Sequence, residues 1–520
     1  MTQRAPIPVI DLFAGPGGLG EGFSSAVDTD GRRRFEIKVS IEKDEVAHRT
    51  LSLRALFRSF PDGTVPDCYY DYVRGKITRE QLFADPAVAV AGQHALTEAR
   101  CAELGKTSHE TIDGWVREAV GNASEWVLIG GPPCQAYSVA GRSRLRPGNA
   151  VAFEDDKRHF LYTEYLRIIK LFNPSVFVME NVKGMLSSKH GGSPIFDRIL
   201  ADLRSPGGDS TYLVRSLVVD GDEPKPLDYL IESECFGVPQ RRHRVILFGV
   251  RSDVAKSMPS QTRELGKFKL KAAGGMVSVE AALSGLPALR SRLSVKEDSH
   301  QLWRSALKSA PSALKLWRMP IRPAIEVMMA RSWATADAYK SHGSRFDARP
   351  IELGSVLPPE LHNWIHDPRL GGVLQHEARS HMESDLHRYM FAACFARLRD
   401  DSPKLGHFPP KLLPNHANVG SEKVPFVDRF RVQLAGEPSS TVVSHICKDG
   451  HYFIHPDPAQ CRSLTVREAA RLQTFPDSYF FEGNRTQQYH QVGNAVPPWL
   501  ARQIADVVFD FMQAALQARH

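Results

Sequence analysis

The amino-acid sequence predicts an α/β protein whose first half forms a doubly wound sheet and whose second half adds a separate lobe. Apolar residues 7–13 are typical of a short buried strand, a glycine turn follows at 15–18, and residues 19–26 continue as a helix. Residues 35–42 then form a second expected strand. Strand, glycine turn, helix and strand in this order open a doubly wound sheet.

The alternation of strands and helices continues to about residue 250. Residues 67–120 are expected to form a polar, helical insert. The other expected elements are a helix over 44–57, a strand at 126–129, a helix over 161–171, and strands at 175–179, 214–219 and 244–250. Beyond them, residues 252–430 show only weak periodicity, which predicts the separate lobe. Helical patterning resumes at Ser463 and closes with a helix over 498–516.

The composition is that of an ordinary soluble protein. With 520 residues, of which 42% are hydrophobic and 24% charged, the chain has room for a large domain and a second lobe. No apolar run approaches the roughly 18 residues of a membrane span, and no signal-peptide pattern opens the sequence. Seven cysteines without a Cys-x-x-Cys pair argue against a disulfide framework or a zinc ribbon. We therefore expect a cytoplasmic protein.

The positive charge is concentrated in one segment. The whole chain carries a net charge of +7, but residues 251–350 contain 18 Lys and Arg against 8 Asp and Glu, which is +10. The remainder of the chain therefore sums to −3, from 7 − 10. Such a distribution favours a local surface for a polyanion over general basicity.

One cysteine stands at the end of a stiffened turn. The stretch Gly130-Gly131-Pro132-Pro133-Cys134 follows the apolar strand at 126–129, and its two prolines fix φ on the approach to the thiol. A thiol aimed in this way can act as a nucleophile. A proline-rich turn that merely packs a small apolar side chain is the alternative.

Three further motifs lie at expected strand ends. Residues 11–18 form a turn where bare backbone can approach a nucleotide-like ligand, and Glu42 closes the second strand, where a carboxylate can bind ribose hydroxyls. Glu180 ends another strand and would open onto the same crevice as Cys134. Residues 240–244 supply guanidinium groups suited to phosphate or a base carbonyl, although a solvated charge run is the alternative there.

Together these motifs resemble those of the C5-cytosine DNA methyltransferases. The resemblance rests on six motifs in the family's order, at 11–18, 130–138, 180–184, 240–244, 467–477 and 491–498. It implies a Rossmann-like, S-adenosylmethionine-dependent methyltransferase fold with a separate, enlarged target-recognition lobe. The implied domains are a catalytic and cofactor-binding domain over 1–251 with the insert at 67–120, a recognition lobe and linker over 252–460, and a closing segment over 461–520 that completes the catalytic domain.

The resemblance also implies a reaction. Cys134 would add to C6 of a cytosine while Glu180 bonds or protonates N3, so that C5 takes the methyl group of S-adenosylmethionine and leaves S-adenosylhomocysteine. Arg244 would hold the cytosine O2, and Arg242 a phosphate or the catalytic loop. The base must be flipped out of double-stranded DNA, because C6 is unreachable in a stacked duplex.

Cofactor residues follow from the same resemblance. They are Phe13, Gly15, Gly17, Glu42, Leu161 and Asn494. In this family a short Asp-containing stretch contacts the adenine amine of the cofactor. That stretch is not recognisable in this sequence, and Asp113 is a stand-in for it. The helix with Arg467 and Arg471 would brace the recognition lobe.

No metal is expected. His376, His381, Asp385 and His387 suggest a metal site, but His376 and His387 on one helix would lie about 16 Å apart, too far to share an ion.

The implied partner is double-stranded DNA, and the protein is expected to act as a monomer with no membrane partner. The implied role is restriction-modification or phage defence, in which a cognate nuclease or defence proteins are further candidate partners. Three other functions stay open: a tRNA-methylating enzyme of this fold, an amino-methylating DNA enzyme and a non-catalytic DNA-binding regulator. The basic segment 251–350 argues against the first, Cys134 after Pro-Pro against the second, and the intact motifs around Cys134 and Glu180 against the third.

Overall fold

The computed structural model divides the chain into two compact units. It describes residues 5–133, 161–190, 193–207, 210–221, 223–258, 268–351, 356–415, 428–448 and 450–518. Unit 1 comprises Met1–Val65, Phe83–Gly275 and Ala495–His520, and unit 2 comprises Pro66–Leu82 and Met276–Asn494. These limits differ from the expected domain ends at 251 and 460, because residues 252–275 fall in unit 1 and residues 461–494 in unit 2.

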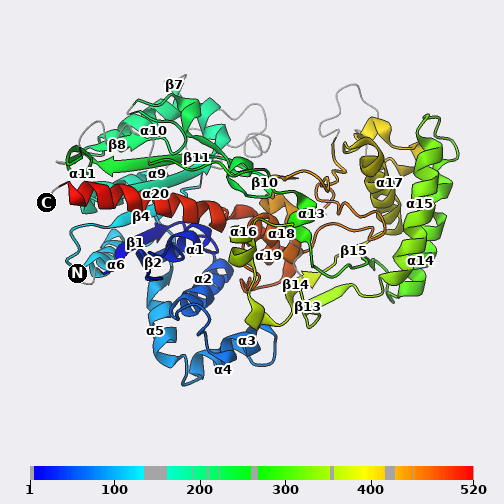
Figure 1. The fold of residues 1–520 in the computed structure, drawn as a ribbon, viewed down its shortest axis with the longest axis horizontal. Helices are drawn as coiled ribbons and strands as arrows, with labels where there is room; N and C mark the ends of the chain where they lie inside the picture. Colours follow the sequence, from blue (N-terminus) through cyan, green and yellow to red (C-terminus); the bar gives the residue numbers. More distant parts are fainter. Residues whose placement is uncertain are drawn as a thin grey trace. The chain divides into compact units, whose positions relative to one another are not determined.

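Unit 1 is built on a mixed sheet (Figure 1). Its described strands lie in the order β3, β2, β1, β4, β5, β11, β8, with β9 beside β11. Their bounds are β1 Ile7–Leu12, β2 Phe35–Glu42, β3 Ala99–Cys101, β4 Val127–Gly130, β5 Val176–Val182, β8 Tyr212–Arg215, β9 Leu230–Glu232 and β11 His243–Arg251. The strands from β3 to β5 pair in parallel, whereas β11 is antiparallel to all its neighbours. The predicted α/β class is confirmed.

Helices cover both faces of the sheet. Side chains of β1 alternate, so that Ile7 and Val9 join one apolar cluster while the neighbouring Ile10 joins another. The first cluster includes residues of α1 (Gly18–Ser24), α11 (Ser252–Lys256) and α20 (Pro498–Gln517). The second includes residues of α6 (His109–Val120), α9 (Leu161–Phe172) and α10 (Ile195–Arg204). The sheet is therefore doubly wound.

Helices α1 and α20 pack unusually closely. A Cβ on Gly18 would lie 2.3 Å from Val496 O, and one on Gly22 would lie 2.4 Å from Ala501 Cβ. Only glycine allows this approach at the two positions. The final helix, expected over 498–516, thus packs against the first helix of the chain, and both ends of the sequence build unit 1.

The insert at 67–120 is only partly as expected. It contains the predicted helices, α3 (Asp67–Val73), α4 (Arg79–Ala84), α5 (Ala89–Glu98) and α6, but also the unpredicted strand β3. Its first part, 66–82, belongs to unit 2. There the Tyr70 hydroxyl donates to Asp367 Oδ2 at 2.9 Å and the Tyr72 hydroxyl to Glu482 Oε1 at 2.5 Å.

Unit 2 is largely helical. Its longer helices are α14 (His300–Ser309), α15 (Arg322–Thr335), α17 (Glu383–Arg399) and α19 (Arg485–Asn494), with the shorter α13 (Val279–Leu283), α16 (Pro359–Ile365) and α18 (Val466–Leu472). Its described strands are β16 (Ser439–Ser440) and two short pairs, β12 (Arg292–Leu293) with β15 (Ser380–His381) and β13 (Gly343–Asp347) with β14 (Val373–Glu377). An apolar cluster around Trp303 and Trp317 packs α14, α15 and α17 together.

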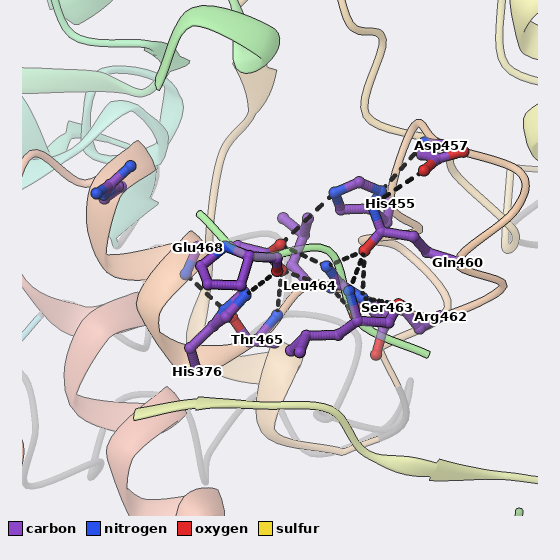
Figure 2. Close-up of polar contacts among 12 residues, drawn as sticks. His376, His455, Asp457, Gln460, Arg462, Ser463, Leu464, Thr465 and Glu468 are labelled. Carbon is purple, nitrogen blue, oxygen red and sulfur yellow. Dashed lines mark hydrogen bonds and ion pairs between the residues drawn. The ribbon is translucent and has the colours of Figure 1, made fainter. Parts of the chain in front are cut away.

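A polar cluster is buried in the same unit (Figure 2). Arg462 forms two bonds of 2.7 Å to the Glu468 carboxylate, which also accepts the Thr465 backbone N–H. His455 Nε2 lies 3.5 Å from that carboxylate. Burial lowers the pKa of His455 to about 4, so this ring is neutral at neutral pH.

Candidate active site

The glycine turn after β1 adopts a strained backbone. The φ angles of Phe13, Gly15 and Gly17 are 59°, 58° and 98°, all in the left-handed region. A non-glycine residue there, such as Phe13, is uncommon and costs free energy, as is often found at ligand sites. A Cβ added to Gly15 would meet nothing within 4 Å, so the turn has an open side where backbone is bare.

Glu42 is tied to this turn. It ends β2, and its Oε2 accepts the Gly15 backbone N–H at 2.9 Å while its Oε1 accepts the Asp44 N–H at 2.8 Å. The structure therefore brings the predicted ribose-binding carboxylate to the predicted cofactor turn. These contacts suit a nucleoside lying against the open side of Gly15.

The two remaining cofactor candidates lie in different units. Leu161 begins α9 in unit 1, where its Cδ2 is 3.7 Å from the position that a Cβ on Gly105 would take. Asn494 is the last residue of α19 and of unit 2, and its Nδ2 lies 3.1 Å from His490 Nδ1. Its role at the cofactor stays a prediction.

Glu180 lies directly against the turn that leads to Cys134. Its Oε2 is 2.9 Å from the position of a Cβ on Gly131, so a side chain there would displace the carboxylate. Asn181 donates from its side chain to Pro132 O at 3.4 Å and ties the same turn to β5. Cys134 itself lies outside the described residues, which end at Pro133 on this side.

Arg244 joins Glu180 from the neighbouring strand. Antiparallel pairing of β11 with β5 sets Arg244 opposite Val182, and its Nε lies 2.8 Å from Glu180 Oε1 in a mostly buried ion pair. Its Nη1 donates to His243 O at 2.9 Å, which orients the guanidinium. The predicted acid and the predicted base-carbonyl ligand are thus adjacent.

Arg242 is buried next to this pair. Burial holds the pKa of its guanidinium well below the usual range, and the charge of Arg244 lowers it further. Ser233 fixes the strand here, because its hydroxyl lies 2.8 Å from Arg242 O and 3.0 Å from Gln240 O and accepts the Arg242 N–H at 3.2 Å. Sequence reasoning did not single out Ser233, which no motif signals.

One site suggestion from the sequence stays a prediction, and another is changed by the structure. Asp113, the stand-in for an adenine contact, accepts from Arg167 Nη1 at 2.7 Å in a largely buried ion pair, and its role at the cofactor stays a prediction. The histidines do not share a helix: His376 lies in β14 and His381 in β15, and only His387 lies in α17. The prediction of one shared helix was therefore wrong. His376 instead lies in a strand, where its ring contacts Thr465 and Pro287, each 89 residues away in the sequence.

A different group has metal-like spacing. Within the described ranges, ligand atoms of Glu232, Glu234 and His243 lie within 4.8 Å of one another. His243 Nε2 is 2.8 Å from Glu234 Oε1, a hydrogen bond that accounts for the grouping without an ion.

Among the described helices, none combines the length and the apolar composition that a membrane span requires.

A methyltransferase is among the solved structures that share this fold. A solved structure of a candidate DNA modification methyltransferase encoded within an E. coli prophage superposes with a TM-score of 0.51 at 19% identity, covering 98% of this chain and 99% of that one. At this identity the likeness concerns the fold alone.

The family follows from sequence comparison. The profile of the C-5 cytosine-specific DNA methylases matches residues 107–311 and 381–510. Type II methyltransferase M.Bpa9945I of Bacillus paralicheniformis is 31% identical over 96% of this chain and 98% of its own length. Type II methyltransferase M.AgeI of Thalassovita gelatinovora is 27% identical over 96% of this chain and 98% of its own length. The chain belongs to the C-5 cytosine-specific DNA methylase family and is a DNA (cytosine-5-)-methyltransferase.

Proposed function

We propose that this enzyme methylates C5 of a cytosine flipped out of double-stranded DNA, with Cys134 as the covalent nucleophile. The supporting observation is the placement of the Glu180 carboxylate against Gly131, in the turn that leads to Cys134, with Arg244 paired to it. A thiol, a carboxylate and a guanidinium around one base are the groups that this reaction requires. The turn at Gly15 and the Glu42 carboxylate fit the nucleoside of S-adenosylmethionine, which supplies the methyl group when bound.

The residues act in sequence. The Cys134 thiolate forms a bond to C6 while Glu180 delivers a proton to N3, which leaves electron density at C5 for methylation. After methyl transfer a base removes the C5 proton and the C6–S bond breaks, which restores the Cys134 thiolate. N3 returns its proton to Glu180, and neutral 5-methylcytosine is released. Arg244 holds O2 of the ring during these steps, and Arg242 orders the phosphate or the loop beside it. Phe13, Gly15, Gly17, Glu42, Leu161 and Asn494 hold the cofactor.

The biological setting is part of the proposal. Curated relatives over nearly the whole chain are named type II methyltransferases, which supports DNA marking in restriction-modification or phage defence, with a cognate nuclease as partner. We propose a cytoplasmic monomer that binds duplex DNA through the lobe containing much of the basic segment 251–350. No metal has a part in the proposed steps.

The test combines activity with binding. Bisulfite sequencing of DNA from cells that express the protein should show 5-methylcytosine at one recurring site. Cys134→Ser should abolish methyl transfer while the dissociation constants for duplex and for S-adenosylhomocysteine stay within about twofold. Turnover retained in Cys134→Ser, or methylation of tRNA in place of DNA, would overturn the proposal.

A further inference from the structure

Tyr165 lies beside the strand ends that carry the site. It stands in α9, one turn after Leu161, and its side chain is fully buried. Its ring contacts Phe177 of β5 edge to face, with centroids 6.3 Å apart. Its Cε2 lies 3.1 Å from the position of a Cβ on Gly130. Tyr165 therefore fills the space next to the end of β4, where the turn toward Cys134 begins.

The Tyr165 hydroxyl contacts two neighbouring strands. Its oxygen lies 3.3 Å from Leu128 O in β4 and 3.1 Å from Val178 O in β5. Leu128 stands two residues before Gly130, and Val178 stands two residues before Glu180. One hydroxyl thus joins the strand that leads to the expected nucleophile and the strand that carries the expected acid.

A phenylalanine at position 165 could not make the hydrogen bonds of the Tyr165 hydroxyl. A buried hydroxyl is tolerated only where it finds a partner, and here two carbonyls accept from it. Burial raises the pKa of Tyr165 well above its usual range, and Asp11 raises it further once this carboxyl is ionised. The hydroxyl consequently keeps its proton at neutral pH, and this one proton is shared between a carbonyl of β4 and a carbonyl of β5.

We propose that Tyr165 is a positioning residue for methyl transfer, whose hydroxyl holds β4 and β5 in the alignment that sets Gly131, in the turn toward Cys134, beside Glu180. This inference rests on the proposed function, in which both side chains act on one cytosine ring. Reacting atoms must approach to about 3–3.5 Å, and a misplacement of about 1 Å can slow a reaction by about a hundredfold. A slightly relaxed strand end therefore slows thiol attack far more than it weakens binding of cofactor or DNA.

The test measures the covalent step directly. A duplex with 5-fluorocytosine at the mapped target position should trap the adduct, because fluorine cannot leave C5 as a proton does. With S-adenosylmethionine present, Tyr165→Phe should form this adduct about tenfold more slowly than the wild type. Dissociation constants for S-adenosylhomocysteine and for the duplex should change by less than about twofold.

Tyr229→Phe is the matched control. Tyr229 is also fully buried in unit 1, and its hydroxyl donates to Val214 O of β8 at 3.1 Å, on a strand that carries no site residue. It should lose a similar amount of thermal stability but keep the wild-type adduct rate. Wild-type adduct rates in Tyr165→Phe, or equal slowing in both variants, would overturn the positioning role. A wild type that methylates but forms no adduct would instead overturn the proposed covalent mechanism, and with it this inference.

Discussion

The cores of the two units differ in the share of buried charge. In unit 1 a sheet lies between two layers of apolar side chains, and ion pairs such as Arg54 with Glu21 are buried beside them. Unit 2 has an apolar cluster as well, but it also buries Arg462, Arg467 and Arg471, each at most 1% exposed. Apolar layers depend on shape and volume, whereas a buried charge depends on each of its partners.

The buried arginines of unit 2 are fully engaged. Arg471 forms two bonds to Asp477, at 2.9 and 2.8 Å, and Arg467 donates to three backbone carbonyls. Both stand on α18, the helix that the sequence resemblance associates with bracing the recognition lobe. We infer that unit 2 is specified by directional bonds, and that losing one partner costs more there than a packing defect costs in unit 1.

Removing one partner of a buried pair in unit 2 should have the largest effect. Glu468→Gln leaves the Arg462 guanidinium without its charged partner (Figure 2). The free energy of unfolding of unit 2 should fall by about 3–5 kcal/mol, measured by urea unfolding with hydrogen exchange on its peptides. Glu326→Gln, which breaks the more exposed pair with Arg322, should cost less than about 0.5 kcal/mol. Equal losses in the two variants would contradict the comparison.

Crowding the helix contact of unit 1 should have a smaller effect. A methyl group on Gly22 would lie 2.4 Å from Ala501 Cβ and 2.5 Å from Arg502 N, so Gly22→Ala forces α1 and α20 apart. We expect a loss of about 1–3 kcal/mol in unit 1. Gly114→Ala in α6 meets nothing within 4 Å and should be neutral or stabilising. Identical melting temperatures for both variants would show that the close approach is not needed.

Acid should weaken unit 2 gradually. Burial lowers the pKa of His376 to about 4 and that of His381 to about 3, from 6.5. Between these values the unfolded chain binds a proton that the folded chain does not, so stability is complete above pH 6.5 and falls as the pH drops toward 4. Each histidine contributes at most about 1.4 kcal/mol per pH unit. Hydrogen exchange in unit 2 that is independent of pH over this range, after correction for intrinsic rates, would contradict neutral buried rings.

Among the buried carboxyl groups of unit 1, Asp11 has the opposite pH dependence. Burial raises the pKa of Asp11 from 3.8 to about 8. Between these values the folded chain holds a proton that the unfolded chain lacks, so this contribution to stability declines as the pH rises toward 8. Asp11→Asn should remove the decline, and its stability relative to the wild type should grow by at most about 1.4 kcal/mol per pH unit. A constant difference between the two proteins would mean that Asp11 is ionised throughout.

The difference between the two units also explains how much of the structure could be predicted from the sequence. Strands such as β1 and β4 are apolar runs ended by glycine, a local signal, and the placement of Glu180 beside the Cys134 turn follows from parallel strands ending at one edge. The sequence reading ended its strand at 179, although β5 continues to Val182. Tyr165 was missed because its ring fits a helical apolar face, and nothing local shows what its hydroxyl contacts.

Most of unit 2 lacked such local signals. Tyr72 bonds to Glu482, 410 residues away, and this pairing helps to draw part of the expected insert into unit 2. His376 was placed on a helix because spacing alone cannot distinguish a buried strand from a helix turn in a short segment. Hydrogen bonds between residues that are far apart in the sequence leave no periodic pattern in it, so sequence analysis cannot predict them.

The most direct measurement of the proposed chemistry is the site of the covalent bond. The enzyme trapped on a 5-fluorocytosine duplex should be digested and its nucleotide-linked peptide identified by mass spectrometry. We predict that the nucleotide is attached to Cys134 and that Glu180→Gln greatly reduces the yield. Attachment to another of the seven cysteines, or full methylation activity without any adduct, would contradict the account.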